Sequence, residues 1–182
     1  MTVNPIDQLD DRSTLLAVQY LAEDLQGGRP TVVQSEAEAR HVLSSLLAQA
    51  DIPNASPDDL LPSQDVALAA ARRALVALND DAITHTLTAG LLAEPPEDEQ
   101  MSVEAALAAT AVLALLITWL QTKVVLRIRR KGGKTEVDFT IDKQATDGQT
   151  LREIATALGA VLGLPTSVDP STPGSDQENA PR

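Results

Sequence analysis

The sequence predicts a mainly helical protein. An N-terminal helical bundle is followed by a C-terminal α+β unit (helix, two-stranded antiparallel hairpin, helix) and a disordered tail. Of the 182 residues 43% are apolar and only 2% aromatic, so the core must be built mainly from Ala and Leu, which favour helices. Six segments repeat apolar residues at helical spacing. One segment alternates charged and apolar residues on both sides of a Gly-Gly pair, as a hairpin does.

The first two helices are expected in an acidic segment. Residues 13–26 carry one apolar stripe and end at Gly27-Gly28, which stops a helix. The second helix begins after Ser35, which forms a capping-box pattern with Glu38. The residues that follow keep the helical spacing without interruption, so one face of this helix should be buried.

Two further helices complete the predicted bundle. A loop at residues 51–62 contains three prolines, and helices are then expected at about residues 64–78 and 81–93. The fourth helix is expected to bury a stripe made of Ile83, Leu87 and Leu91. The acidic bundle would therefore occupy residues 1–93.

A hinge is expected between this bundle and the second unit. Residues 94–100 contain Pro95-Pro96 and four acidic residues, which cannot continue a helix. Residues 101–164 are expected to form an Ala/Leu helix, the hairpin and a last helix that begins at a second capping-box pair, Thr150 and Glu153. Residues 165–182 are rich in Pro, Ser and Asp and are expected to be disordered.

The register of the hairpin follows from its two strands. With Gly132-Gly133 as a two-residue turn, charged residues pair on one face and apolar residues pair on the other. The expected pairs are Arg127 with Asp138, Arg129 with Glu136, and Leu126 with Phe139. A slip by one residue would expose the whole apolar face, so this register should be well specified.

The charge of the chain is unevenly distributed. The net charge is −12, and the first hundred residues hold 17 acidic and 5 basic residues, whereas the remainder holds nine of each. An acidic surface argues against contact of the first half with nucleic acid or anionic lipid. The N-terminus lacks the basic and apolar segments of a secretory signal, so a cytoplasmic location is expected.

Catalysis, a cofactor and a metal site are not expected. The chain has no Cys, which excludes thiol nucleophiles and Cys-based metal sites. His41 has no second ligand one turn away, and His85 has only Asp81, which indicates a surface Asp-His contact. We therefore predict that the protein is not an enzyme.

Basic residues at the hairpin turn form a candidate partner-binding patch. Arg127 and Arg129 have carboxylates opposite them, which leaves three bases without a predicted partner: Arg130, Lys131 and Lys134. These bases could steer an acidic protein, or contact nucleic acid in a regulator. No aromatic residue is interleaved for base stacking, and this favours a protein partner.

The Ala/Leu helix allows two interpretations. Residues 105–122 contain no charge, so residues 105–120 could span the inner membrane with the basic hairpin at its cytoplasmic face. The length is close to the lower limit of about 17 residues for a span, and many positions are Ala. A small-residue stripe (Ala106, Thr110, Ala114 and Thr118) opposite bulky Leu residues is instead typical of a helix buried between protein layers. This second interpretation is favoured.

Residues 102–143 resemble a known family. The Ala/Leu helix that ends in Ile117-Thr118-Trp119-Leu120, the strand from Val124 to Arg129, the glycine turn and the strand from Glu136 to Thr140 are similar to the effector-associated constant component of bacterial conflict and signalling systems. The resemblance implies a non-catalytic module that couples partner proteins by contact.

The expected function is therefore that of a non-catalytic protein–protein interaction or adaptor module. Its partner would be another protein, and its apolar helix could also form half of a homo-oligomer interface. The alternatives are a single-span membrane protein and, second, a nucleic-acid-binding regulator that uses the basic hairpin.

Overall fold

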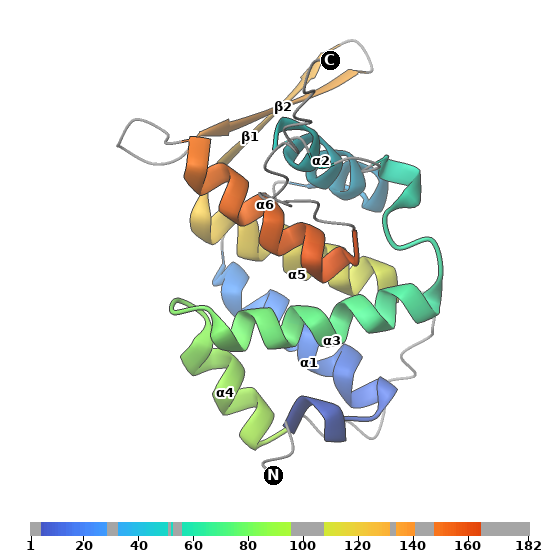
Figure 1. Cartoon of the computed structure of the whole chain (residues 1–182), viewed down its shortest axis with the longest axis vertical. Helices are drawn as coiled ribbons and strands as arrows, with labels where there is room; N and C mark the ends of the chain where they lie inside the picture. The colour runs from blue at the N-terminus through green and yellow to red at the C-terminus, as the bar shows by residue number, and fades with distance from the viewer. Residues whose placement is uncertain are drawn as a thin grey trace, which may run out of the picture.

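A computed structural model gives the fold of the chain and describes residues 5–28, 33–50, 52, 56–95, 108–131, 134–140 and 148–164. The protein is mainly helical, with a two-stranded antiparallel hairpin near the C-terminus (Figure 1). The elements are η1 (Pro5–Gln8), α1 (Asp11–Gln26), α2 (Glu36–Gln49), η2 (Pro57–Asp59), α3 (Gln64–Asp80), α4 (His85–Ala93), α5 (Ala108–Lys123), β1 (Val125–Lys131), β2 (Lys134–Thr140) and α6 (Gly148–Leu162). The predicted fold class is confirmed.

Helix α5 occupies the centre of the molecule. In Figure 1 it crosses the middle, with α1 and α3 below it and α2 above it, and it packs against all three. Its sequence is apolar around most of its circumference, and the residues of its core face are fully or nearly fully buried: Val112, Leu113, Leu115, Leu116, Ile117 and Leu120. A helix that is apolar on several sides is stable in water only when other elements cover it.

One hydrophobic cluster joins the two units expected from the sequence. Leu21, Leu43 and Leu75 from the first half belong to the same cluster as Leu116 and Leu158 from the second half. The expected boundary therefore does not separate two cores. Residues 96–100 of the expected hinge, and the whole expected tail at 165–182, lie outside the described residues.

The start of α2 uses the predicted capping residues with one difference. The backbone N–H of Glu38 donates to Ser35 Oγ at 3.2 Å, as in a capping box. The Glu38 carboxylate accepts from the backbone N–H of Gln34 at 2.7 Å, one residue earlier than in the usual arrangement. Two backbone donors near the helix start are thereby satisfied.

The prediction for α4 is wrong in its start and in its buried stripe. The helix begins at His85, because Asp81 Oδ1 accepts from the backbone N–H groups of Ile83 and Thr84 in a turn. Ile83 is 57% exposed and Leu87 is 40% exposed, whereas Thr84 and Thr88 are fully buried.

Hydrogen bonds explain why the two threonines occupy the buried face of α4. Thr84 Oγ1 donates to the Leu78 carbonyl at 2.6 Å, and Thr88 Oγ1 donates to the Thr84 carbonyl at 3.0 Å. A buried hydroxyl that is hydrogen-bonded avoids the desolvation cost of an unpaired one. These bonds allow a face with two threonines to be buried in place of the more apolar face.

The hairpin has the register that its sequence predicts. The opposing residues include Leu126 and Phe139, Arg127 and Asp138, and Arg129 and Glu136. Val124 and Leu126 are buried in the common core, and the hairpin lies beside α2 at one end of the molecule (Figure 1). The described residues of the apolar face of the hairpin are therefore covered, fully or in part, by the helices.

Helix α6 begins earlier than predicted and packs against α3 and α2. Its first residue is Gly148, so Thr150 lies inside its first turn and is not the capping residue. Arg73 on α3 donates from Nε to the carbonyl of Val161 at 2.7 Å. This bond satisfies a carbonyl near the C-terminal end of α6, where four carbonyls lack partners within the helix.

Candidate functional site

A groove of about 420 Å³ runs between α1, α2 and α5. Most of its surface is apolar, and several polar side chains also line it. The lining residues are Leu15, Gln19, Ala22, Glu23, Gln26, Val33, Gln34, Ser35, Glu36, Ala39, Thr110, Ala111, Leu113, Ala114, Ile117, Thr118 and Gln121. Along α1 and along α5 they span three helical turns, a length of about 16 Å at 1.5 Å per residue.

The small-residue stripe of α5 lines the groove. Thr110, Ala114 and Thr118 follow each other one turn apart, and all three line the groove. Thr118 Oγ1 donates to the Ala114 carbonyl at 2.8 Å, so its hydroxyl is satisfied within the helix. The sequence favoured burial of this stripe between protein layers, but Thr110 and Ala114 are exposed.

One end of the groove is closed by a small polar network around Glu36. Thr110 Oγ1 donates to Glu36 Oε2 at 2.8 Å and thereby connects α5 to α2. Arg40 pairs with the other oxygen, Oε1, at 2.7 Å. The first turn of α2 is thus held against α5, and it forms a fixed wall of the groove.

The hairpin patch differs from the prediction at Arg130. Its guanidinium forms two hydrogen bonds with the Glu38 carboxylate, from Nε at 2.7 Å and from Nη2 at 2.9 Å. The Glu38 side chain is only 9% exposed. The hydrogen bond from Arg130 holds the pKa of Glu38 below its usual value; partial burial opposes this shift, and the Gln34 N–H assists it.

Arg130 is therefore a structural link between the hairpin and α2, and its charge is already compensated. The side chains of Lys131 and Lys134, which complete the predicted patch, lie outside the described part of the structure, as do those of Asp138 and Phe139. Arg129 and Glu136, which face each other across the two strands, are exposed. The partner-binding role predicted for Arg130, Lys131 and Lys134 stays a prediction.

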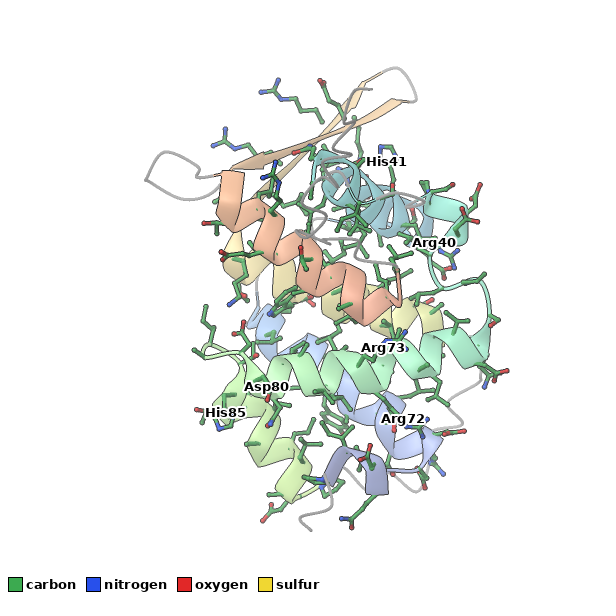
Figure 2. The ribbon with its side chains drawn as sticks, viewed as in Figure 1. Arg40, His41, Arg72, Arg73, Asp80 and His85 are labelled. Carbon is green, nitrogen blue, oxygen red and sulfur yellow. The ribbon has the colours of Figure 1, made fainter. Side chains whose placement is uncertain are left out.

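The two histidines do not form a site with the acidic residues around them. His41 on α2 and His85 on α4 lie in separate parts of the molecule (Figure 2). The His85 ring contacts the Asn79 carbonyl through Nδ1, and the Asp81 side chain turns instead to Lys123, with Oδ2 at 2.5 Å from Nζ. The predicted side-chain contact between Asp81 and His85 is therefore wrong. Within the described ranges no three His, Cys, Asp or Glu side chains converge to hold a metal ion.

Asp81 has a structural role at the junction of α3, α4 and α5. Burial alone would raise the pKa of Asp81. The hydrogen bond from Lys123 and the N–H groups of Ile83 and Thr84 lower this pKa by a larger amount, so it lies below its usual value. Lys123 also lies 5.9 Å from the centre of the Trp119 ring, within the range of a cation–π contact. This ion pair fixes the end of α5 against the start of α4.

Membrane insertion was the main alternative for α5. Over the described residues, α5 is 16 residues long, and none of the helices there combines the length and apolarity needed to cross a bilayer.

The sequence pattern did not reveal the groove, although it contained part of the evidence. The small-residue stripe was recognised, but spacing alone cannot show whether a small stripe contacts a helix of the same chain or stays open. Comparison with known proteins gives no further indication, because no family model, curated protein or solved structure matches the chain.

Proposed function

We propose that the protein is a non-catalytic protein-interaction module that receives an amphipathic helix of a partner protein in the groove between α1, α2 and α5. The observation that carries the proposal is the uncovered stripe of Thr110 and Ala114 on the most central helix of the fold. Small side chains at this place allow the backbone of another helix to approach closely. The groove offers the apolar surface into which an amphipathic helix can lay its apolar face.

The shape of the groove favours a helix over a small molecule. Small-molecule sites bury most of the surface of a compact ligand. This groove instead extends for three turns along α1 and α5, and its lining includes the glutamines Gln19, Gln26, Gln34 and Gln121. Amide side chains such as those of Gln19, Gln34 and Gln121 can hydrogen-bond to the polar flanks of a docked helix.

The hairpin provides a second surface for an adaptor function. Lys131 and Lys134 at its turn lie at the end of the two strands, and they remain candidates for contact with an acidic partner. The resemblance of residues 102–143 to the effector-associated constant component supports the same class of function. A module with two contact surfaces could hold two proteins together.

A display selection tests the groove directly. A library of 16-residue peptides with aliphatic residues at positions i, i+4, i+7 and i+11, and random residues elsewhere, is selected on the protein. Ala114→Trp, which fills the middle of the groove, is the counter-target. We expect selected peptides to bind the wild-type protein and to lose at least about tenfold in affinity, or 1.4 kcal/mol, against Ala114→Trp.

Two further variants place the same Trp side chain elsewhere. One is a second test of the groove, and the other controls for folding and for the added aromatic surface. Gln121→Trp places the same side chain at one end of the groove and should also weaken binding. Ala160→Trp places it on the exposed face of α6, away from the groove, and should leave binding unchanged. Peptides that bind all four proteins equally, or a selection that enriches nothing, would contradict the proposal.

A further inference from the structure

The charges around the groove give information about its ligand. Two carboxylates line it, Glu23 on the α1 wall and Glu36 on the α2 wall, and none of the described lining residues is Lys, Arg or His. The four glutamines that line the groove are uncharged, and an amide can donate or accept, so they select no sign of charge. Among the described lining residues, only these two carboxylates can therefore give the groove a charge preference, and the field of the whole molecule adds to it.

The two carboxylates differ in how far they are compensated. Glu36 accepts from Thr110 and pairs with Arg40 at 2.7 Å, so much of its charge is neutralised inside the protein. Glu23 is exposed, and no described residue forms an ion pair or hydrogen bond with its side chain. Glu23 is thus the carboxylate that a ligand cation can pair with.

The electrostatic field of the first half of the chain also favours a cationic ligand over an acidic one. Four of the six described helices belong to the segment of 100 residues with 17 acidic and 5 basic residues. Such a surface attracts a cationic ligand and repels an acidic one at distances up to the Debye length, about 8 Å at physiological ionic strength. A second copy of this chain, with a net charge of −12, would be repelled.

We infer that the groove is specific for a cationic amphipathic helix, with aliphatic residues on the stripe that meets α5 and Lys or Arg on the flank that meets α1. This inference rests on the proposed function. It identifies the ligand as a basic helical segment of a different protein, and it assigns Glu23 as the residue that distinguishes this ligand from a neutral or acidic helix.

Two matched peptide libraries test the inference. Both carry the same aliphatic stripe; the flanking positions are fixed as Lys in one library and as Glu in the other. Recovery on the wild-type protein is compared with recovery on Ala114→Trp, which sets the background. We expect the Lys library to be recovered about three- to tenfold more than the Glu library at low salt, as for partly exposed ion pairs, and less so at about 0.5 M salt.

Variants of two neighbouring acids locate the source of the preference. Glu23→Gln should reduce the advantage of the Lys library, because Glu23 lines the groove. Asp24→Asn removes the same charge one residue later, at a position that does not line it, and should have a smaller effect. An equal effect of the two variants would overturn the role of Glu23.

The possible failures are distinguishable. Equal recovery of both libraries above background would overturn the charge preference and leave the helix-binding groove intact. Recovery of the Glu library in excess would overturn it as well. If neither library exceeds the background of Ala114→Trp, the groove does not receive a helix, and the proposed function itself fails.

Discussion

Single charged side chains hold this fold together at the junctions between elements. Glu38 accepts a backbone N–H at the start of α2 and also binds Arg130 of the hairpin. Asp81 accepts from the turn before α4 and pairs with Lys123 at the end of α5. In both cases one carboxylate satisfies local backbone donors and a distant cation, so its loss affects two elements together.

The contacts of these carboxylates with nearby backbone groups can be predicted from the sequence, but their ion pairs with distant residues cannot. The pair Ser35 and Glu38 predicts a capped helix start, because the partners lie within one turn. Nothing in that pattern identifies Arg130, which lies 92 residues away. Sequence spacing encodes neighbours along a helix or across a tight hairpin, whereas contacts between elements depend on how those elements pack.

The Asp81 pair should make stability depend on pH. The pKa of Asp81 is lower in the folded than in the unfolded protein, so its contribution is present above the unfolded pKa of about 3.9 and is lost as the pH falls through the folded pKa. Asp81→Asn should lower the free energy of unfolding by about 1–2 kcal/mol at pH 7. Urea denaturation at several pH values measures this difference, which should shrink towards pH 2.

The neighbouring acid provides a matched control for this experiment. Asp80 is exposed at the end of α3, and Asp80→Asn should change the free energy of unfolding at pH 7 by less than about 0.5 kcal/mol. If Asp81→Asn were as mild as Asp80→Asn, the ion pair with Lys123 would not contribute to stability. A deficit of Asp81→Asn that persists unchanged at pH 2 would also contradict the electrostatic origin.

At the scale of elements, the sequence predicts the structure within a helix or hairpin better than the position and buried face of that element in the fold. The register of the hairpin follows from alternation and from the Gly-Gly turn, because a slip would reverse its two faces. The start of α4 was mispredicted because apolar residues at helical spacing, such as Ile83 and Leu87, outweighed the turn formed by Asp81 and Thr84. Two hydroxyl groups with backbone partners determined which face of α4 is buried, and hydrophobic periodicity does not account for such bonds.

The link between the hairpin and α2 should be measurable as a coupling between Arg130 and Glu38. Arg130→Gln should destabilise the protein, since it removes a bidentate pair with Glu38. It should also increase hydrogen exchange of the β1 amides near Leu126 and Ile128. In a double-mutant cycle with Glu38→Gln, the two changes should be clearly less than additive.

Arg129 provides the control for this coupling, because it lies next to Arg130 in β1 and opposite Glu136 on the exposed face. Arg129→Gln should show no coupling with Glu38→Gln. Additive effects of Arg130 and Glu38 would mean that the hairpin is held by its apolar face alone. Because of this link, the charge reversal Arg130→Glu would disturb the hairpin itself. It is therefore unsuitable as a test of partner binding at the turn.

At the scale of the whole molecule, composition and periodicity predict the mainly helical class, but they do not predict how the halves combine. The proline-containing segment at 94–100 suggested two units, because Pro-Pro interrupts a helix. The core nevertheless runs through both, with α5 packed against α1, α2 and α3. The groove is a consequence of that packing, so it could not be recognised before the positions of α1 and α2 relative to α5 were known.

A shared core implies that the two halves unfold together. Trp119 on α5 is the only tryptophan, so its fluorescence reports the second half, whereas far-ultraviolet circular dichroism reports all helices. The two signals should give the same urea midpoint. Leu43→Ala on α2 creates a cavity in the first half and should lower the free energy of unfolding by about 2–5 kcal/mol. It should move both midpoints equally, whereas two independent domains would leave the Trp119 transition where it is.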